Sequence, residues 1–156
     1  MEFFKFIFTM LISFSPVLVS RAFLMNAPDR LYKEIVQPSF APPGWAFGVV
    51  WTVLYFLIGI SLFLFCTAEG DSSQKRMGFI FFGIQLLLNV AFMPICFGLR
   101  SFLGGLIICV LLAVFLILTI VQFFKISKIS AYLLIPYLLW GLFAIILSYK
   151  VYILNP

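Results

Sequence analysis

Long apolar runs, separated by short charged or turn-forming segments, occupy most of this chain. Each run has the roughly 20 residues that a helix needs to cross about 30 Å of hydrocarbon. Residues 111–118 are all apolar and do not alternate with polar residues, as the strands of a membrane barrel would. The sequence therefore predicts an all-α integral membrane bundle, a single domain over residues 1–156 with five transmembrane helices at residues 6–25, 44–67, 77–97, 102–124 and 129–149.

The overall composition excludes a water-soluble domain. Hydrophobic residues make up 65% of the chain and charged residues 10%, and the mean hydropathy is +1.23. The net charge of +5 comes from Lys and Arg residues that stand singly or in pairs and form no basic stripe. We therefore expect membrane lipids as partners and no nucleic acid.

The ionisable and sulfur-containing residues limit the chemistry. The chain has no histidine, which removes imidazole metal ligands and Ser-His or Cys-His catalytic pairs. We expect no metal and no resident cofactor, and we interpret the three cysteines, without CxxC spacing, as small apolar side chains. Acidic residues are absent from the predicted spans, which weakens the hypothesis that the protein is a proton pump or an ion-coupled carrier. The five acids are Glu2, Asp29, Glu34, Glu69 and Asp71.

The first connection, residues 26–43, is longer than an ordinary structureless loop. Tyr32, Phe40 and Pro42 give it side chains with which to pack, so it is predicted either as a lid over a ligand site or as a mobile, solvated linker. We interpret the preceding apolar run as a mature helix and not as a signal peptide, because Glu2 lies in its charged region. Lys and Arg divide five against five between the two sides, which leaves the orientation open.

Three stripes of side chains recur at the spacing of one helical turn. Buried amides in a membrane need partners, so those on the third span are predicted either to join helices or to meet a ligand. Trp51 and Trp140 lie about two turns or more inside their spans, deeper than interfacial anchors, which makes them candidates for ligand contact. The stripes are Phe47, Trp51 and Tyr55; Gln85, Asn89, Phe92 and Cys96; and Pro136, Trp140, Ala144 and Ser148.

Three motifs resemble the translocator protein family, also called tryptophan-rich sensory proteins or TspO/MBR. The longest is residues 38–55, Pro-Ser-Phe-Ala-Pro-Pro-Gly-Trp-Ala-Phe-Gly-Val-Val-Trp-Thr-Val-Leu-Tyr. The second is residues 85–91, Gln-Leu-Leu-Leu-Asn-Val-Ala, followed by Pro94 and by Phe-Gly-Leu-Arg-Ser at 97–101. The third is Pro-Tyr-Leu-Leu-Trp at 136–140 with Phe143 and Ala144.

This resemblance implies a five-helix bundle, usually a homodimer, with a pocket covered by the first loop. It implies porphyrins as ligands and, in some members, sterols and isoquinoline carboxamide drugs, and some bacterial members are reported to degrade protoporphyrin in light. By position, the family's pocket residues fall on Trp51, Asn89, Trp140 and Ala144, with Tyr32 and Pro42 from the lid and Tyr55 and Phe92 as neighbours.

The chain departs from the family pattern at several positions. Phe40 and Phe92 stand where tryptophan is common, and Val49 replaces a usual proline. The sterol motif at the end of the last span reads poorly, because residues 147–150, Leu-Ser-Tyr-Lys, lack its spacer residue. We therefore rank sterol binding below porphyrin binding.

Three functions remain as hypotheses. The first is a tetrapyrrole-binding sensor or carrier, in which a flat macrocycle lies among Trp51, Phe92 and Trp140. The second is an enzyme that degrades protoporphyrin with light and oxygen, in which Trp51 and Trp140 act as redox-active residues. The third is a passive channel or assembly protein without a small ligand. The expected location is a bacterial cell membrane.

Overall fold

The computed structural model describes the backbone of residues 2–26 and 35–155, and the side chains of residues 2–21 and 35–155. Every regular element in these residues is helical, and five spans among them are long and apolar enough to cross a membrane. The predicted all-α membrane fold is therefore confirmed. The elements are α1 (Glu2–Asn26), α3 (Gly44–Thr67), α4 (Ser72–Met93), a π-helix (Pro94–Gly98), α5 (Phe102–Ile126), α6 (Lys128–Leu133) and α7 (Ile135–Leu154).

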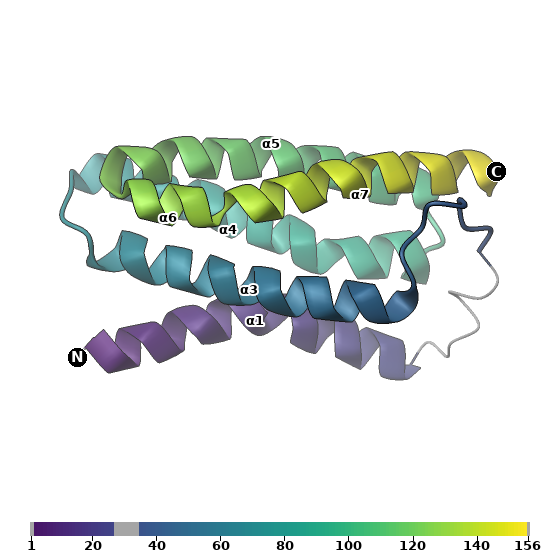
Figure 1. Ribbon diagram of the computed structural model, residues 1–156, viewed down its shortest axis with the longest axis horizontal. Helices are drawn as coiled ribbons and strands as arrows, with labels where there is room; N and C mark the ends of the chain where they lie inside the picture. Colours follow the sequence, from purple (N-terminus) through teal and green to yellow (C-terminus); the bar gives the residue numbers. More distant parts are fainter. Residues whose placement is uncertain (1, 27–34, 156) are drawn as a thin grey trace.

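The helices lie side by side along the long axis of the molecule (Figure 1). Helices α1, α4 and α7 run in one direction and α3 and α5 run in the other, so that α4 and α5, joined by a tight turn, are antiparallel neighbours (Figure 1). Helix α5 also packs against α7, and α1 packs against α3. This arrangement brings α3, α4 and α7, which carry the three side-chain stripes, into one bundle.

The last span is not the single helix that its apolar run predicts. Helix α6 ends at Leu133, Leu134 forms a turn, and α7 begins at Ile135. Pro136 explains the break, because proline has no backbone N–H and its ring clashes with the carbonyl four residues earlier. The turn lies just before Tyr137 and Trp140 in the chain.

The third span is longer than the apolar run at both ends. Helix α4 begins at Ser72 because Asp71 caps it, with the Asp71 carboxylate accepting a hydrogen bond of 2.9 Å from the Gln74 N–H. At the other end Pro94 opens one turn of π-helix, in which the Leu99 N–H donates to the Pro94 carbonyl at 3.0 Å. Hydropathy alone missed the polar first turn and the wide last turn.

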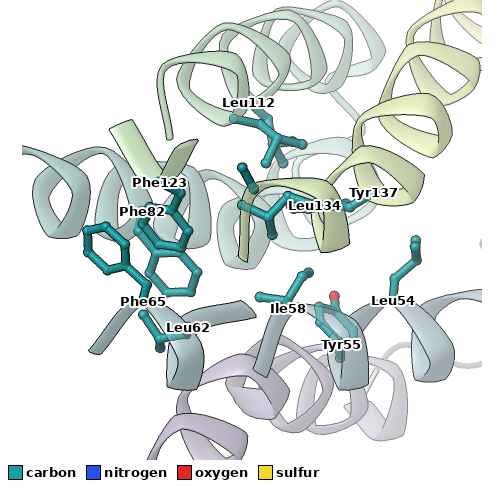
Figure 2. Close-up of a cluster of buried hydrophobic side chains, with 12 residues drawn as sticks. Leu54, Tyr55, Ile58, Leu62, Phe65, Phe82, Leu112, Phe123, Leu134 and Tyr137 are labelled. Carbon is teal, nitrogen blue, oxygen red and sulfur yellow. The ribbon is translucent and has the colours of Figure 1, made fainter. Parts of the chain in front are cut away.

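Stacked phenylalanine rings form the core between α3, α4 and α5. The rings of Phe65 and Phe123 stack with centroids 3.8 Å apart, and Phe82 lies almost parallel to Phe123 at 6.0 Å (Figure 2). Gly78 permits this stack, since a Cβ atom there would lie 2.5 Å from Phe65 Cζ. Close packing of this kind carries helix association in lipid, where burying apolar surface gives little advantage over facing the hydrocarbon tails.

Polar side chains inside the bundle are bonded across helices. Ser61 of α3 donates to the Ser130 carbonyl of α6 at 2.7 Å, and Ser130 donates back to the Ser61 carbonyl. Both residues are fully buried. The reciprocal pair ties α6 to α3 where side-chain hydroxyls would otherwise be unsatisfied.

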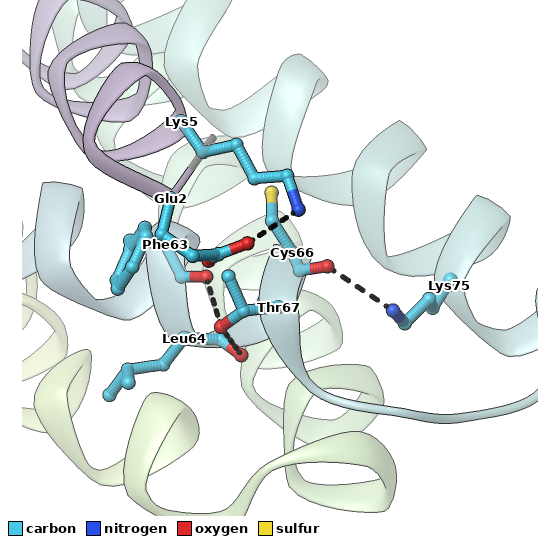
Figure 3. A network of polar contacts seen from close by, with 7 residues as sticks. All are labelled: Glu2, Lys5, Phe63, Leu64, Cys66, Thr67 and Lys75. Carbon is cyan, nitrogen blue, oxygen red and sulfur yellow. Dashed lines mark hydrogen bonds and ion pairs between the residues drawn. The ribbon is translucent and has the colours of Figure 1, made fainter.

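At one end of the bundle, polar and charged side chains form hydrogen bonds and an ion pair near the ends of α1, α3 and α4. Lys75 Nζ donates to the Cys66 carbonyl at 3.3 Å, the Thr67 hydroxyl donates to the Phe63 carbonyl, and Lys5 pairs with Glu2 at 2.9 Å (Figure 3). Lys75 thus satisfies a carbonyl in the last turn of α3, where a cation is also favoured by the helix dipole. The Lys75 bond therefore joins the start of α4 to the end of α3.

Candidate ligand-binding site

Two pairs of aromatic rings join α3 to α7. Phe47 and Trp140 meet edge to face with centroids 5.7 Å apart and planes at 72°, and Trp51 and Tyr137 do the same at 6.0 Å and 68°. Because the two helices are antiparallel, a step of one turn forward on α3 matches a step of about one turn back on α7. The pairs therefore form two successive contacts between the helices.

Trp51 continues the aromatic group toward α4. Its indole stacks on the Tyr55 ring with centroids 5.2 Å apart and planes at 24°. Phe14 of α1 packs on Tyr55 as well, at 5.8 Å. The Tyr55 ring therefore has aromatic contacts to two other rings. Its hydroxyl, the one polar group of the side chain, needs a hydrogen-bond partner inside the bundle.

A buried chain of hydrogen bonds starts at that hydroxyl. Tyr55 Oη donates to Asn89 Oδ1 at 2.8 Å, Asn89 Nδ2 donates to Tyr137 Oη at 2.7 Å, and Tyr137 Oη donates to Gln85 Oε1 at 3.0 Å. All four residues are buried, and Figure 2 shows the Tyr55 hydroxyl pointing away from its own helix. One polar network thus joins α3, α4 and α7.

The network ends in an unmet donor. Gln85 is fully buried, and its Nε2 has no hydrogen-bond partner among the described residues. A buried amide donor without an acceptor costs about 1–3 kcal/mol. An acceptor oxygen or nitrogen placed beside Gln85 Nε2 would remove this cost.

Two of the predicted site residues point elsewhere. Phe92 packs edge-on against Phe97 at 6.2 Å and lies close to Gly105 of α5. Ser148 shares a hydrogen bond of 3.5 Å with Cys109 of α5. The side chains of Phe92 and Ser148 are thus engaged with α5 or the π-helix, while half-buried Ala144 lies one turn beyond Trp140 on α7.

The segment preceding α3 reaches the same aromatic group. Phe40 contacts Phe143 of α7 with centroids 6.4 Å apart, and Phe143 packs on Trp140 at 5.2 Å. Pro42 is half-buried just before α3. Tyr32, the other residue predicted for the lid, lies outside the described residues.

Tyr137 and Phe143 were not among the predicted site residues. Tyr137 is at the centre of the network, but the predicted stripe of four-residue steps on its helix begins at Pro136, which is exposed. A step of three residues back from Trp140 leads to Tyr137 instead, and positions three apart share a helix face as well as positions four apart. The three-residue step from Trp140 was therefore the sequence signal that could have identified Tyr137.

Comparison with known proteins decides the family. The model of the TspO/MBR family matches residues 6–154. The chain belongs to the TspO/MBR family. It is 41% identical over 133 residues to the Tryptophan-rich protein TspO of Archaeoglobus fulgidus, with 85% of each chain covered. It is 38% identical over 125 residues to the protein of that name from Chlorobaculum tepidum, covering 80% of this chain and 79% of the other.

A eukaryotic relative widens the comparison. The human Translocator protein is 33% identical over 137 residues, which cover 86% of this chain and 80% of the human one. Family membership agrees with the resemblance read from residues 38–55, 85–91 and 136–140. For this TspO/MBR protein, the aromatic contacts and the polar network lie on those same motifs.

Proposed function

We propose that this TspO/MBR protein binds a tetrapyrrole such as protoporphyrin IX at the α3–α7 aromatic site. The observation that carries the proposal is Trp51, which stacks on Tyr55 and lies edge-on to Tyr137, the two tyrosines whose hydroxyls belong to the buried hydrogen-bond network. Half-buried aromatic rings keep surface that a flat apolar macrocycle can cover. A mostly apolar lining with a few convergent polar groups is typical of small-molecule sites.

The polar groups suit the edge of such a ligand. A porphyrin has an apolar ring with two propionate side chains, so it needs aromatic faces for the ring and donors or water for the carboxylates. Trp51 and Trp140 supply indole N–H donors as well as faces, and Gln85 Nε2 is a donor without a partner among the described residues. Sterols and isoquinoline carboxamides, the other ligands implied by the family, share the apolar body and bring fewer polar groups.

The binding proposal predicts saturable quenching in the dark. A Trp45→Phe protein keeps Trp51 and Trp140 as its only indoles, because the chain has three tryptophans and Trp45 is 74% exposed on the first turn of α3. Titration with protoporphyrin in detergent micelles should quench their emission and saturate at a fixed ratio to protein. Quenching that rises linearly with porphyrin, as with free tryptophan amide in the same micelles, would support a passive membrane protein instead.

Light-dependent degradation of the bound porphyrin is a second candidate function. The porphyrin would absorb the light, dioxygen would be the oxidant, and the indoles of Trp51 and Trp140 would exchange electrons with the excited ligand. The stacked Trp51–Tyr55 pair favours this candidate, because a phenol next to an indole extends the set of oxidisable rings. Its test is replacement of either indole by phenylalanine, with porphyrin binding and light-dependent porphyrin loss measured separately.

A sensor or transporter without catalysis is the alternative. The human relative is called Translocator protein, a name that describes transport by that protein. Both versions need the same binding site and differ only in whether porphyrin is consumed. We further propose a bacterial cell membrane as the location of this multi-pass protein.

We also propose that the protein forms a homodimer. The outer face of α4 is available for it: a Cβ atom at Gly83 would meet no atom within 4 Å, whereas Gly78 is used inside the bundle against Phe65. Crosslinking in native membranes should then yield dimers, and Gly83→Leu should reduce them while a substitution on exposed Leu18 of α1 should not. Monomer alone across a wide range of protein-to-lipid ratios would contradict the proposal.

A further inference from the structure

One side chain ties the segment before α3 to the end of α7. The Val36 N–H donates to Asn155 Oδ1 at 2.9 Å, and Asn155 Nδ2 donates to the Val36 carbonyl at 3.1 Å. Both backbone groups of Val36 are therefore satisfied by a residue 119 positions away, in the way that a neighbouring β-strand would satisfy them. We call this pair of bonds the Asn155 clamp.

Asn155 also ends α7. Its Nδ2 donates to the Val151 carbonyl at 2.8 Å, and its backbone N–H donates to the same carbonyl at 3.1 Å. The side-chain amide thus uses both of its donor hydrogens and its acceptor oxygen. Aspartate at this position would lack the donors, and leucine would lack donors and acceptor, so an amide is required for the clamp and the cap together.

The clamped segment leads directly to the aromatic site. Four residues after Val36, Phe40 contacts Phe143, which packs on Trp140. Between them Pro38 is buried, and the Ala41 N–H donates to the Pro38 carbonyl at 2.9 Å to form a turn. The side chains of Val36 and Phe40 are 54% and 44% exposed, so their burial holds the segment only in part. The backbone bonds to Asn155 are therefore a main attachment.

We propose that Asn155 is a positioning residue that latches the segment 35–43 over the α3–α7 aromatic site, and that opening the site requires release of the clamp. The proposal rests on the proposed function for the identity of the ligand, but the clamp itself is testable without one. Because the latch consists of two hydrogen bonds at the edge of the bundle, it can open while the helices stay packed.

The first test is amide hydrogen exchange in the purified full-length protein. Asn155→Leu keeps the number and branching of the side-chain heavy atoms and removes both clamp bonds, together with the side-chain bond to the Val151 carbonyl. Exchange at the Val36 N–H should therefore rise by roughly 5- to 100-fold. Ile153→Ala, on an exposed side chain of the same turn, is the matched control and should leave Val36 unchanged. Faster exchange confined to the last turn of α7, with Val36 unaltered, would mean that Asn155 only caps the helix and would overturn the proposal.

A second, ligand-free measurement asks whether the latch covers the site. In the Trp45→Phe background, acrylamide should quench Trp51 and Trp140 more strongly when Asn155 is replaced by leucine. Equal quenching in the two proteins would show that the clamped segment does not shield the indoles, and the latch over the site would be rejected even if Val36 exchanged faster.

Protoporphyrin release separates the two proposals. If the wild-type protein binds the porphyrin, Asn155→Leu should speed its release in the dark by about as much as it speeds exchange at Val36. Unchanged release from a protein that binds would overturn the latch. A wild-type protein that binds no protoporphyrin would remove the proposed function, and the exchange and quenching measurements would still decide the latch.

Discussion

Light-dependent loss of protoporphyrin is expected to fall far more than porphyrin affinity when Trp51 or Trp140 is replaced by phenylalanine. Phenylalanine keeps most of the apolar contact and loses only the specific aromatic part, roughly 0.5–1.5 kcal/mol, which is about a tenfold change in affinity at most. An indole is much easier to oxidise than a benzene ring. If the indoles exchange electrons with the excited porphyrin, turnover should therefore drop well beyond that tenfold limit.

The measurement compares dark binding with porphyrin loss under light and dioxygen for the same preparations. Trp45→Phe is the matched control, because it removes an indole from the same helix at a site away from the aromatic group. Equal proportional losses of binding and photochemistry in Trp51→Phe and Trp140→Phe would make the indoles walls of a binding site. Wild-type protein that degrades no more porphyrin than micelles alone would exclude the enzymatic candidate.

Long apolar runs predicted the fold well because lipid imposes a simple rule. A backbone inside hydrocarbon must satisfy its own hydrogen bonds, so a run of about 20 apolar residues has to be a helix. The same rule does not reveal where a span bends. Hydropathy over residues 129–149 is continuous, and the break at Leu134 follows from the missing donor of Pro136, a local property that averaging over a window removes.

The site was predictable in its helical faces and not in its contacts between helices. One-turn steps placed Phe47, Trp51 and Tyr55 on one face, and the structure directs that face toward α4 and α7. Which residue of α7 would meet them depends on the axial register of two antiparallel helices. In the structure Tyr137, about one turn before Trp140, meets Trp51 and Asn89, a pairing that no periodicity within one helix predicts.

Contacts that involve loop segments could not be predicted from the sequence. The pairing of Val36 with Asn155 joins residues 119 positions apart and involves one side-chain amide with no periodic pattern around it. Phe92 and Ser148 show that sharing a helix face with site residues does not predict which neighbour a side chain contacts. Each lies on a stripe with site residues, yet helix α5 packs close enough to engage both side chains.

Replacing Asn89 with leucine is expected to destabilise the bundle by about 1–3 kcal/mol, because the buried Tyr55 hydroxyl would lose its acceptor. Tyr137 would lose one donor but would keep its own bond to Gln85. Unfolding of the detergent-solubilised protein by increasing SDS, followed by circular dichroism, measures the change. A loss below about 0.5 kcal/mol, the level of an ordinary surface substitution, would mean that water or a rearranged partner replaces the amide.

The double variant Asn89→Leu with Tyr55→Phe distinguishes a helix joint from a ligand contact. Removing both partners leaves no unmet hydroxyl, so the double variant should be more stable than Asn89→Leu alone, and the two changes should be non-additive by about 0.5–3 kcal/mol. The affinity of the double variant for protoporphyrin in the dark then distinguishes the two roles of Asn89. If the amide only joins α3, α4 and α7, restoring stability should restore affinity, since the aromatic rings are intact apart from one hydroxyl. If Asn89 meets the ligand, affinity should stay low in a protein whose fold has recovered, because the lost contact is with the porphyrin and not with Tyr55.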